Sequence, residues 1–145
     1  MLKKLIFAAA IVASAMLAGC ASVPMASPEL DNQAKQFTTV PDKAKIYIYR
    51  DENMGAAVKM PVLLNGMSVG DTVAKSYILR EVEPGEHTIV SKTENDAELK
   101  LTAAAGKNYY VWQEVKMGAF SARSKLHLVD DAKGQESVKE CKLIK

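Results

Sequence analysis

Cysteine and histidine are scarce in this chain of 145 residues, since each occurs only twice. No His-x-x-x-His or Cys-x-x-Cys spacing is present to favour a zinc site. The two histidines, His87 and His127, are therefore expected to be polar residues on the surface or on edge strands. We predict that the protein uses no metal and no other cofactor.

An excess of charge of one sign is also missing. The chain has 19 Lys and Arg against 17 Asp and Glu, but Lys3 and Lys4 precede Cys20, so the part after Cys20 carries 17 of each. A nucleic-acid-binding domain is expected to have a surplus of basic residues and a basic face. We therefore predict no nucleic-acid partner.

Recognisable catalytic patterns are lacking as well. No Gly-x-Ser-x-Gly turn of the serine hydrolases occurs. Strand alternation would place Ser124 and His127 on opposite faces of one strand. The carboxylates that could form a glycosidase pair surround a Pro-Gly turn, where acidic residues are expected simply because turns are wet: Glu81, Glu83 and Glu86. The sequence therefore favours a non-enzymatic protein.

A long apolar run occurs only at the start of the chain. The basic residues of MLKK precede 13 mostly apolar residues, 5–17, and small residues follow. A helix of that length rises about 20 Å, less than the roughly 30 Å hydrocarbon core of a bilayer. Residues 1–19 thus have the anatomy of an export signal peptide rather than a permanent span.

The signal ends in Leu17-Ala18-Gly19-Cys20, which resembles the lipobox of bacterial lipoproteins. The resemblance implies that the thiol of Cys20 receives diacylglycerol and that cleavage before it makes Cys20 the first residue. Two or more acyl chains hold a protein stably on a membrane. The alternative is a plain secretory signal with Cys20 near its cleavage site. Ala21 and Ser22 lack the Asp that retains similar lipoproteins at the inner membrane, so we expect the periplasmic face of the outer membrane.

Residues 20–43 form the lipidated N-terminus and a tether in this interpretation. They contain three prolines and no sustained apolar period, which is typical of a linker. A flexible tether of this length would span about 25 Å. Alternatively, part of it packs on the domain, because Phe37 and Val40 are apolar.

Residues 44–145 are expected to form one mostly β domain, an antiparallel β-sandwich of about seven to eight strands with a short C-terminal helix. Short β-rich runs separated by Gly, Pro and Asn predict this fold, and they occupy residues 44–50, 61–72, 76–82, 85–93, 97–104, 107–117 and 123–129. Asn65-Gly66 is typical of a tight hairpin turn. The C-terminal segment is consistent with a helix capped by Asp130 or Asp131, or with a strand from Ser137 onward.

Alternation indicates which strand faces are buried. We expect Leu99, Leu101 and Ala103 to face the core on one strand, and Leu126 and Leu128 on another. The run Ile46-Tyr47-Ile48-Tyr49 is apolar on both faces, which predicts a strand that is central or covered by neighbours.

The strands carry a family resemblance. IYIYRDE, PVLLNG, EVEPGEHTI, KNYYVWQEVKMG and ARSKLHLVD, with a cysteine near the end, resemble a family of small bacterial lipoproteins described as a domain of unknown function. The likeness spans about residues 44–143. The Asn-Gly and Pro-Gly-Glu-His-Thr segments also resemble PEGA-type β-sandwich modules of envelope proteins. The resemblance implies a compact extracytoplasmic β domain and supplies no substrate.

The candidate binding surface lies in residues 107–117. If Val111 and Val115 face the core, the opposite face of this strand carries Tyr110, Trp112, Glu114 and Lys116. Aromatic rings beside charges can stack on a sugar of the cell-wall glycan or dock a protein. The alternative is that the tether or the terminal helix covers these rings.

These features predict a lipid-anchored periplasmic module that binds or scaffolds an envelope protein or peptidoglycan. One alternative is a glycan-binding domain that uses Trp112. Another is a small envelope enzyme or thiol-active factor that uses His87, His127 or Cys141. For Cys141, burial as a small apolar residue competes with an intermolecular disulfide.

Overall fold

A computed structural model describes residues 22–145. The predicted signal peptide 1–19 and the predicted lipidation site Cys20 lie outside the described residues.

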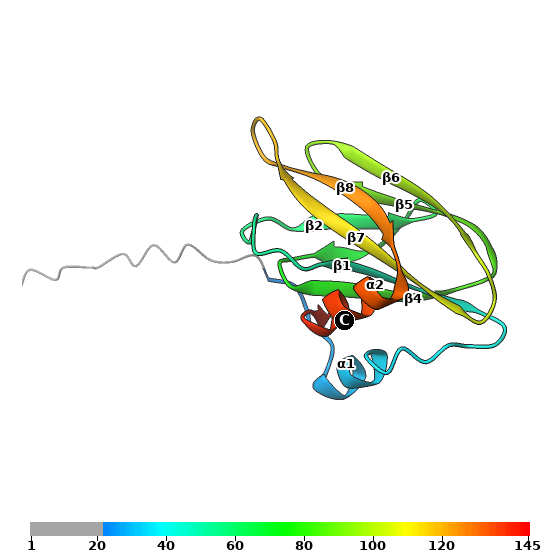
Figure 1. The fold of residues 1–145 in the computed structure, drawn as a ribbon. Coiled ribbons are helices and arrows are strands. Elements are labelled where there is room, and N and C mark those ends of the chain that lie inside the picture. The colour runs from blue at the N-terminus through cyan, green and yellow to red at the C-terminus, as the bar shows by residue number, and fades with distance from the viewer. Residues whose placement is uncertain (1–21) are drawn as a thin grey trace, which may run out of the picture.

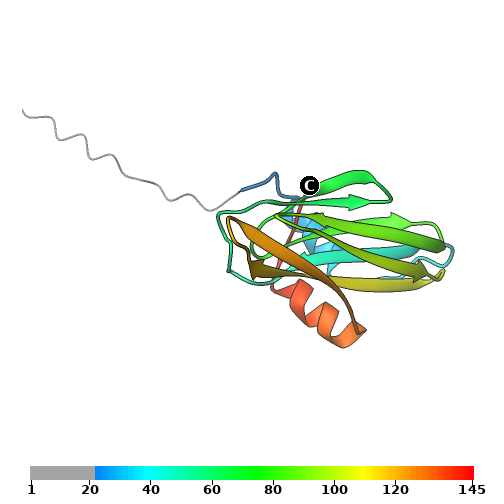
Figure 2. The ribbon, with the colours of Figure 1, turned by 90° about the horizontal axis from the view of Figure 1, so that it is seen from above.

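The described chain is a mostly β sandwich of two sheets, as predicted (Figures 1 and 2). The first sheet has the strand order β8-β7-β1-β4-β9, with β1 (Ala44–Arg50), β4 (Ser76–Val82), β7 (Lys107–Met117), β8 (Ala122–Val129) and β9 (Lys142–Leu143). The second has the order β3-β2-β5-β6, with β2 (Met60–Leu64), β3 (Met67–Thr72), β5 (Gly85–Lys92) and β6 (Asp96–Ala103). The nine strands of the described residues exceed the expected seven to eight, and the last of them, β9, has only two residues.

Two strand pairs of the first sheet are parallel, although a sandwich of hairpins would be wholly antiparallel. β1 pairs with β7 in parallel, and β4 pairs with β9 in parallel. The chain reaches β7 from β1 only after it has built the whole second sheet, so a long crossover makes the first of these pairs.

Two helices cover the outer face of the first sheet (Figure 1). In α1 (Pro28–Ala34), the side chain of Ser27 caps the first turn. In α2 (Asp131–Lys139), the Asp130 carboxylate accepts from the backbone N–H of Lys133. The predicted terminal helix is confirmed, and the alternative strand from Ser137 is not formed because β9 begins only at Lys142.

The alternating residues of β1 explain why the first sheet is buried on both faces. Ile46 and Ile48 lie in the core between the two sheets, whereas Tyr47 and Tyr49 lie under the helices. All four are at most 1% exposed. The prediction of a central, covered strand is confirmed.

Local signals in the second sheet are also confirmed. Asn65 and Gly66 have φ of 52° and 82° and connect β2 to β3 in a tight hairpin turn of type I′, which requires positive φ at both positions. In β6, Leu101 and Ala103 are buried and Leu99 packs against the core.

The prediction that Leu128 is buried is wrong, since it is 50% exposed, whereas Leu126 is buried as expected. β8 is an edge strand paired only with β7. Strand alternation alone does not indicate whether the second sheet extends far enough to cover Leu128.

The N-terminal segment packs on the domain, as the alternative to a free tether predicts. The backbone N–H of Ala26 donates to the carbonyl of Leu143 at 2.9 Å, and Met25 bridges to Ile144. The Phe37 ring lies 5.5 Å from that of Tyr47. The 25 Å reach of a flexible tether therefore does not apply to these residues.

Candidate functional site

A layer of aromatic rings lies between the first sheet and the helices. The Tyr47 ring stacks on Tyr110 at 5.1 Å and on Tyr77 at 6.1 Å between centroids. The Tyr47 hydroxyl donates to the carbonyl of Ala34, and the Tyr77 hydroxyl donates to Asp31 Oδ1 at 2.7 Å. Burial raises the pKa of both phenols, so they stay protonated donors. This layer attaches α1 to the sheet.

The predicted strip on β7 faces outward as expected, because Val111 and Val115 are buried on the core side. Tyr110, however, is completely buried under α2 and Phe37. The alternative that a second layer covers the rings therefore applies to Tyr110. The rest of the strip, Trp112, Glu114 and Lys116, reaches the surface to different extents.

Trp112 is partly exposed and lies against His127 of the neighbouring strand. The two rings stack at 4.8 Å between centroids with 25° between their planes. The indole N–H donates to Glu52 Oε1 at 3.1 Å. One face of the indole is thus occupied, and its polar edge is already bonded to the protein.

Carboxylates flank this ring pair on two sides. Burial raises the pKa of Glu52, whose Oε2 has no hydrogen-bond partner within the described residues. His127 Nε2 lies 2.7 Å from Glu114 Oε2, and this hydrogen bond lowers the pKa of Glu114. Lys116 Nζ lies 3.5 Å from the other Glu114 oxygen. Together these side chains form a small surface of flat rings edged with charge, and we call Trp112, His127, Glu52, Glu114 and Lys116 the Trp112 surface.

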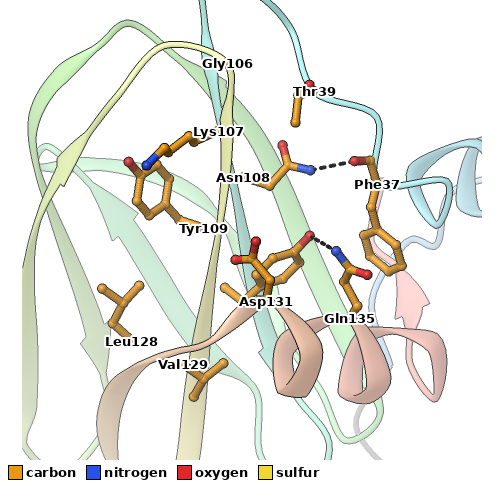
Figure 3. A pocket seen from close by; sticks show the side chains of 11 residues that line it. Phe37, Thr39, Gly106, Lys107, Asn108, Tyr109, Leu128, Val129, Asp131 and Gln135 are labelled. Carbon is orange, nitrogen blue, oxygen red and sulfur yellow. Dashed lines mark hydrogen bonds between the residues drawn. The ribbon is translucent and has the colours of Figure 1, made fainter.

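A hollow of about 410 Å³ lies where β7 begins and α2 starts (Figure 3). Lys107 and Tyr109 lie on one side of β7, whereas Asn108 and Gln135 lie on the other (Figure 3). The amide of Asn108 donates to the carbonyl of Phe37 at 2.8 Å, and that of Gln135 donates to the Tyr110 hydroxyl at 3.2 Å. These bonds hold the N-terminal segment and α2 in place, so two of the hollow's polar groups are already engaged.

Sequence reasoning missed several members of these sites. Phe37 was recognised as apolar, but no pattern indicates that it meets Tyr110. Glu52 and Gln135 lie in segments whose sequence gives no sign of a contact with β7. These contacts form between segments that are distant in the sequence, so no local sequence pattern indicates them.

The expectation for His87 is wrong, because it is buried and lies in β5, an interior strand of the second sheet. Its ring nitrogens lie 2.8 Å from Asn65 Nδ2 and 2.7 Å from the carbonyl of Glu83. The side chain of Asn65, in the turn between β2 and β3, supplies a hydrogen-bond partner that offsets the cost of burying this polar ring. His127 is partly exposed on the edge strand β8, as expected.

The other side chains considered for catalysis are exposed or already engaged within the protein. Ser124 is buried and hydrogen-bonded to Ser91 Oγ at 2.7 Å, on the opposite face of β8 from His127. The glutamates around Pro84 are exposed, and Glu83 forms an ion pair with Lys43.

Cys141 is buried and free, which confirms its interpretation as a small buried residue. Burial raises the pKa of its thiol to about 12, so almost no thiolate forms at neutral pH. Its Sγ lies 3.7 Å from the carbonyl of Arg50. These surroundings disfavour thiol chemistry in the folded protein.

Residues 22–145 have neither a metal-binding cluster of side chains nor a helix that could span a membrane. No group of three or more His, Cys, Asp and Glu side chains in this range is arranged to hold a metal ion. None of the helices in this range is long and apolar enough to cross a membrane.

Comparison with known proteins assigns the sandwich to a class. Residues 41–125 match the model of the family described as "Protein of unknown function (DUF2846)", and the chain belongs to this family. It is similar to a Haemophilus influenzae protein named "Uncharacterized protein", with 34% identity over 140 residues, 94% of this chain and 83% of that protein. No solved structure matches the chain.

Proposed function

We propose that the protein is an exported lipoprotein, anchored through Cys20 on the periplasmic face of the outer membrane. The observation that carries the proposal is the Leu17-Ala18-Gly19-Cys20 sequence directly after an export-type apolar run. A diacylglyceryl thioether with a further acyl chain on the new amine would hold the domain stably on a bilayer.

The proposed role is non-enzymatic: the domain binds or scaffolds an envelope component near the membrane. Confinement to a surface raises its effective concentration toward partners on the same surface. The Trp112 surface is the proposed contact, because it combines a partly exposed indole with charged neighbours. Aromatic residues of this kind are enriched among the residues that dominate binding energy. The resemblance to PEGA-type modules is compatible with such a role.

The anchor is tested by fatty-acid labelling of cells that produce the protein. We expect an alkyne analogue of palmitate to label the native chain and to be absent from C20A. C141A is the matched control, because it removes the other cysteine and keeps the proposed anchor. Labelling of C20A equal to that of C141A would contradict the proposal.

A glycan ligand, such as peptidoglycan, is the second candidate function. The partly exposed ring of Trp112 favours it, since indoles stack on sugar rings. We expect W112A to reduce sedimentation with purified peptidoglycan by at least about tenfold. A tenfold loss of affinity corresponds to about 1.4 kcal/mol, and truncation of a residue that dominates the binding energy costs at least this much. H87A is the control, because His87 is buried in the other sheet, whereas His127 contacts the indole and is unsuitable. Equal sedimentation of W112A and H87A would argue for a protein partner.

A further inference from the structure

Large apolar side chains are exposed at one end of the sandwich. Met117, the last residue of β7, is 80% exposed, and Phe120, in the turn between β7 and β8, is 98% exposed. Met54, in the loop between β1 and β2, is 51% exposed. The loop and the turn adjoin each other, because Val58 of the loop packs in one cluster with Val115 and Ala122 of the two strands. We call this end, with residues 51–59 and 117–121, the apolar end.

The turn holds Phe120 outward by a specific set of hydrogen bonds. The carboxylate of Glu94 accepts from the backbone N–H groups of Ala119, Phe120 and Ser121 at 3.0–3.2 Å. These bonds, with that from Ser121 the largest contribution, lower the pKa of Glu94. The exposed ring is therefore displayed by a fixed turn rather than left on a loose loop.

The described chain begins at this same end. Arg50, where β1 ends and the loop starts, pairs with Ser76, which in turn pairs with Lys142 of β9. Met25 bridges to Ile144, two residues beyond Lys142. In Figures 1 and 2 alike, the blue start of the ribbon, the loop between β1 and β2, and the turn between β7 and β8 form the same end of the molecule.

Covalent reach limits how far Cys20 can lie from the first packed residues of the described chain. Val23 packs against the core, and the backbone N–H of Lys145 donates to the carbonyl of Pro24 at 3.0 Å. Only three residue steps separate Val23 from Cys20, which span at most about 11 Å. A lipid on Cys20 would therefore hold Val23, at the start of the described chain, within that distance of the bilayer surface.

Basic side chains flank the exposed tips. Lys116 and Arg123 lie opposite each other at the base of the β7–β8 turn, a pairing of like charges that is unfavourable by itself. Glu114 and Glu94 balance them in part, at 3.5 and 4.0 Å. The neighbouring loop adds exposed Lys59 and the partly exposed acidic residues Asp51 and Glu52. Lys and Arg side chains suit the phosphate level of a bilayer, beneath which apolar tips enter.

We propose that the apolar end is a second membrane contact, in which Phe120, Met117 and Met54 enter the interface of the bilayer that holds the acyl chains. This inference rests on the proposed lipid anchor. Together, anchor and tips fix the orientation of the sandwich, with the opposite end, at the Pro84-Gly85 turn, directed away from the membrane.

The test measures the depth of position 120 in a bilayer. The full acylated chain carrying F120W is reconstituted into phosphatidylethanolamine and phosphatidylglycerol vesicles with ordinary or brominated acyl chains. The native chain, whose only tryptophan is Trp112, supplies the baseline. We expect the emission added by F120W to shift to the blue and to lose most of its intensity in brominated vesicles.

M67W is the matched control. Met67 is 74% exposed and also lies beside a hairpin turn. That turn bonds to Thr88 near the start of β5, whereas the β7–β8 turn bonds to Glu94 beyond its end. The emission added by M67W is expected to be equal in both kinds of vesicle.

The outcomes separate the inference from the proposal on which it rests. If Cys20 is acylated and the protein is vesicle-bound, equal F120W emission in both lipids overturns the membrane contact and leaves the anchor intact. A blue shift that depends on protein concentration and not on bromine assigns the apolar end to a second copy of the chain and also overturns the contact. An unacylated Cys20 overturns the proposed anchor and this inference together.

Discussion

G134A is expected to destabilise the protein, although Gly→Ala within a helix normally stabilises it by about 1 kcal/mol. Gly134 is buried in α2 directly over the Tyr110 ring. A Cβ at this position would lie 2.2 Å from both Cβ and Cγ of Tyr110, and the Cβ of Tyr110 cannot move unless the strand moves with it. Overpacking of this kind costs about 1–3 kcal/mol, so α2 must shift off the aromatic layer.

The effect is measured as the free energy of unfolding in urea, followed by the fluorescence of Trp112. We expect a loss of about 2 kcal/mol for G134A, the middle of the overpacking range. K133A, at the exposed neighbouring position, is the control and should change stability by less than about 0.5 kcal/mol. A G134A protein as stable as K133A would show that α2 does not pack on Tyr110 as described.

R50M is expected to loosen the loop between β1 and β2. Arg50 is completely buried, and its guanidinium donates to the carbonyls of Gly55 at 2.5 Å and Val58 at 2.7 Å, with longer bonds to Met54 and Thr72. Burial lowers the pKa of Arg50. Because every one of these acceptors is a neutral carbonyl, methionine leaves them without a donor, at about 1–3 kcal/mol for each that stays dry.

We expect R50M to lower the free energy of unfolding by about 3 kcal/mol. The partly buried carbonyls of the loop can regain hydrogen bonds to water, whereas the buried carbonyl of Thr72 cannot. Backbone amides of residues 51–59 should exchange hydrogen faster than in the native protein. K59M removes one positive charge from an exposed position of the same loop and serves as the control. Equal exchange in R50M and K59M would contradict the clamping role of Arg50.

Much of the fold could be predicted from local sequence signals. The seven β-rich runs contain β1 to β8, because the run 61–72 holds both β2 and β3 on either side of its Asn-Gly turn. Turn-forming residues between the runs mark where the strands end. The Asn65-Gly66 turn and the Asp130 cap follow from backbone preferences that need no tertiary context. The covered face of β1 was visible because both of its faces are apolar.

Features that depend on distant parts of the chain could not be predicted in this way. The parallel pairing of β1 with β7 has no local signature. Burial of His87 requires a partner from another hairpin, Asn65. Gln113 is completely buried, with its amide donating to Ser91 Oγ at 2.6 Å, yet its sequence context resembles a half-exposed strand.

The candidate site was predicted only in part. Outward orientation of Trp112, Glu114 and Lys116 follows from the period of the strand. Coverage of Tyr110 does not, because it depends on where α2 and Phe37 pack. The apolar end was not anticipated either, since it brings together two turns that are more than fifty residues apart.

The mass of the N-terminal peptide of the protein, isolated from bacterial membranes, tests the anchor most directly. We predict that the mature chain starts at Cys20 and that this residue carries the added mass of a diacylglyceryl group, with or without a further acyl chain. A mature chain that starts elsewhere, or a Cys20 with a free thiol, would contradict the account.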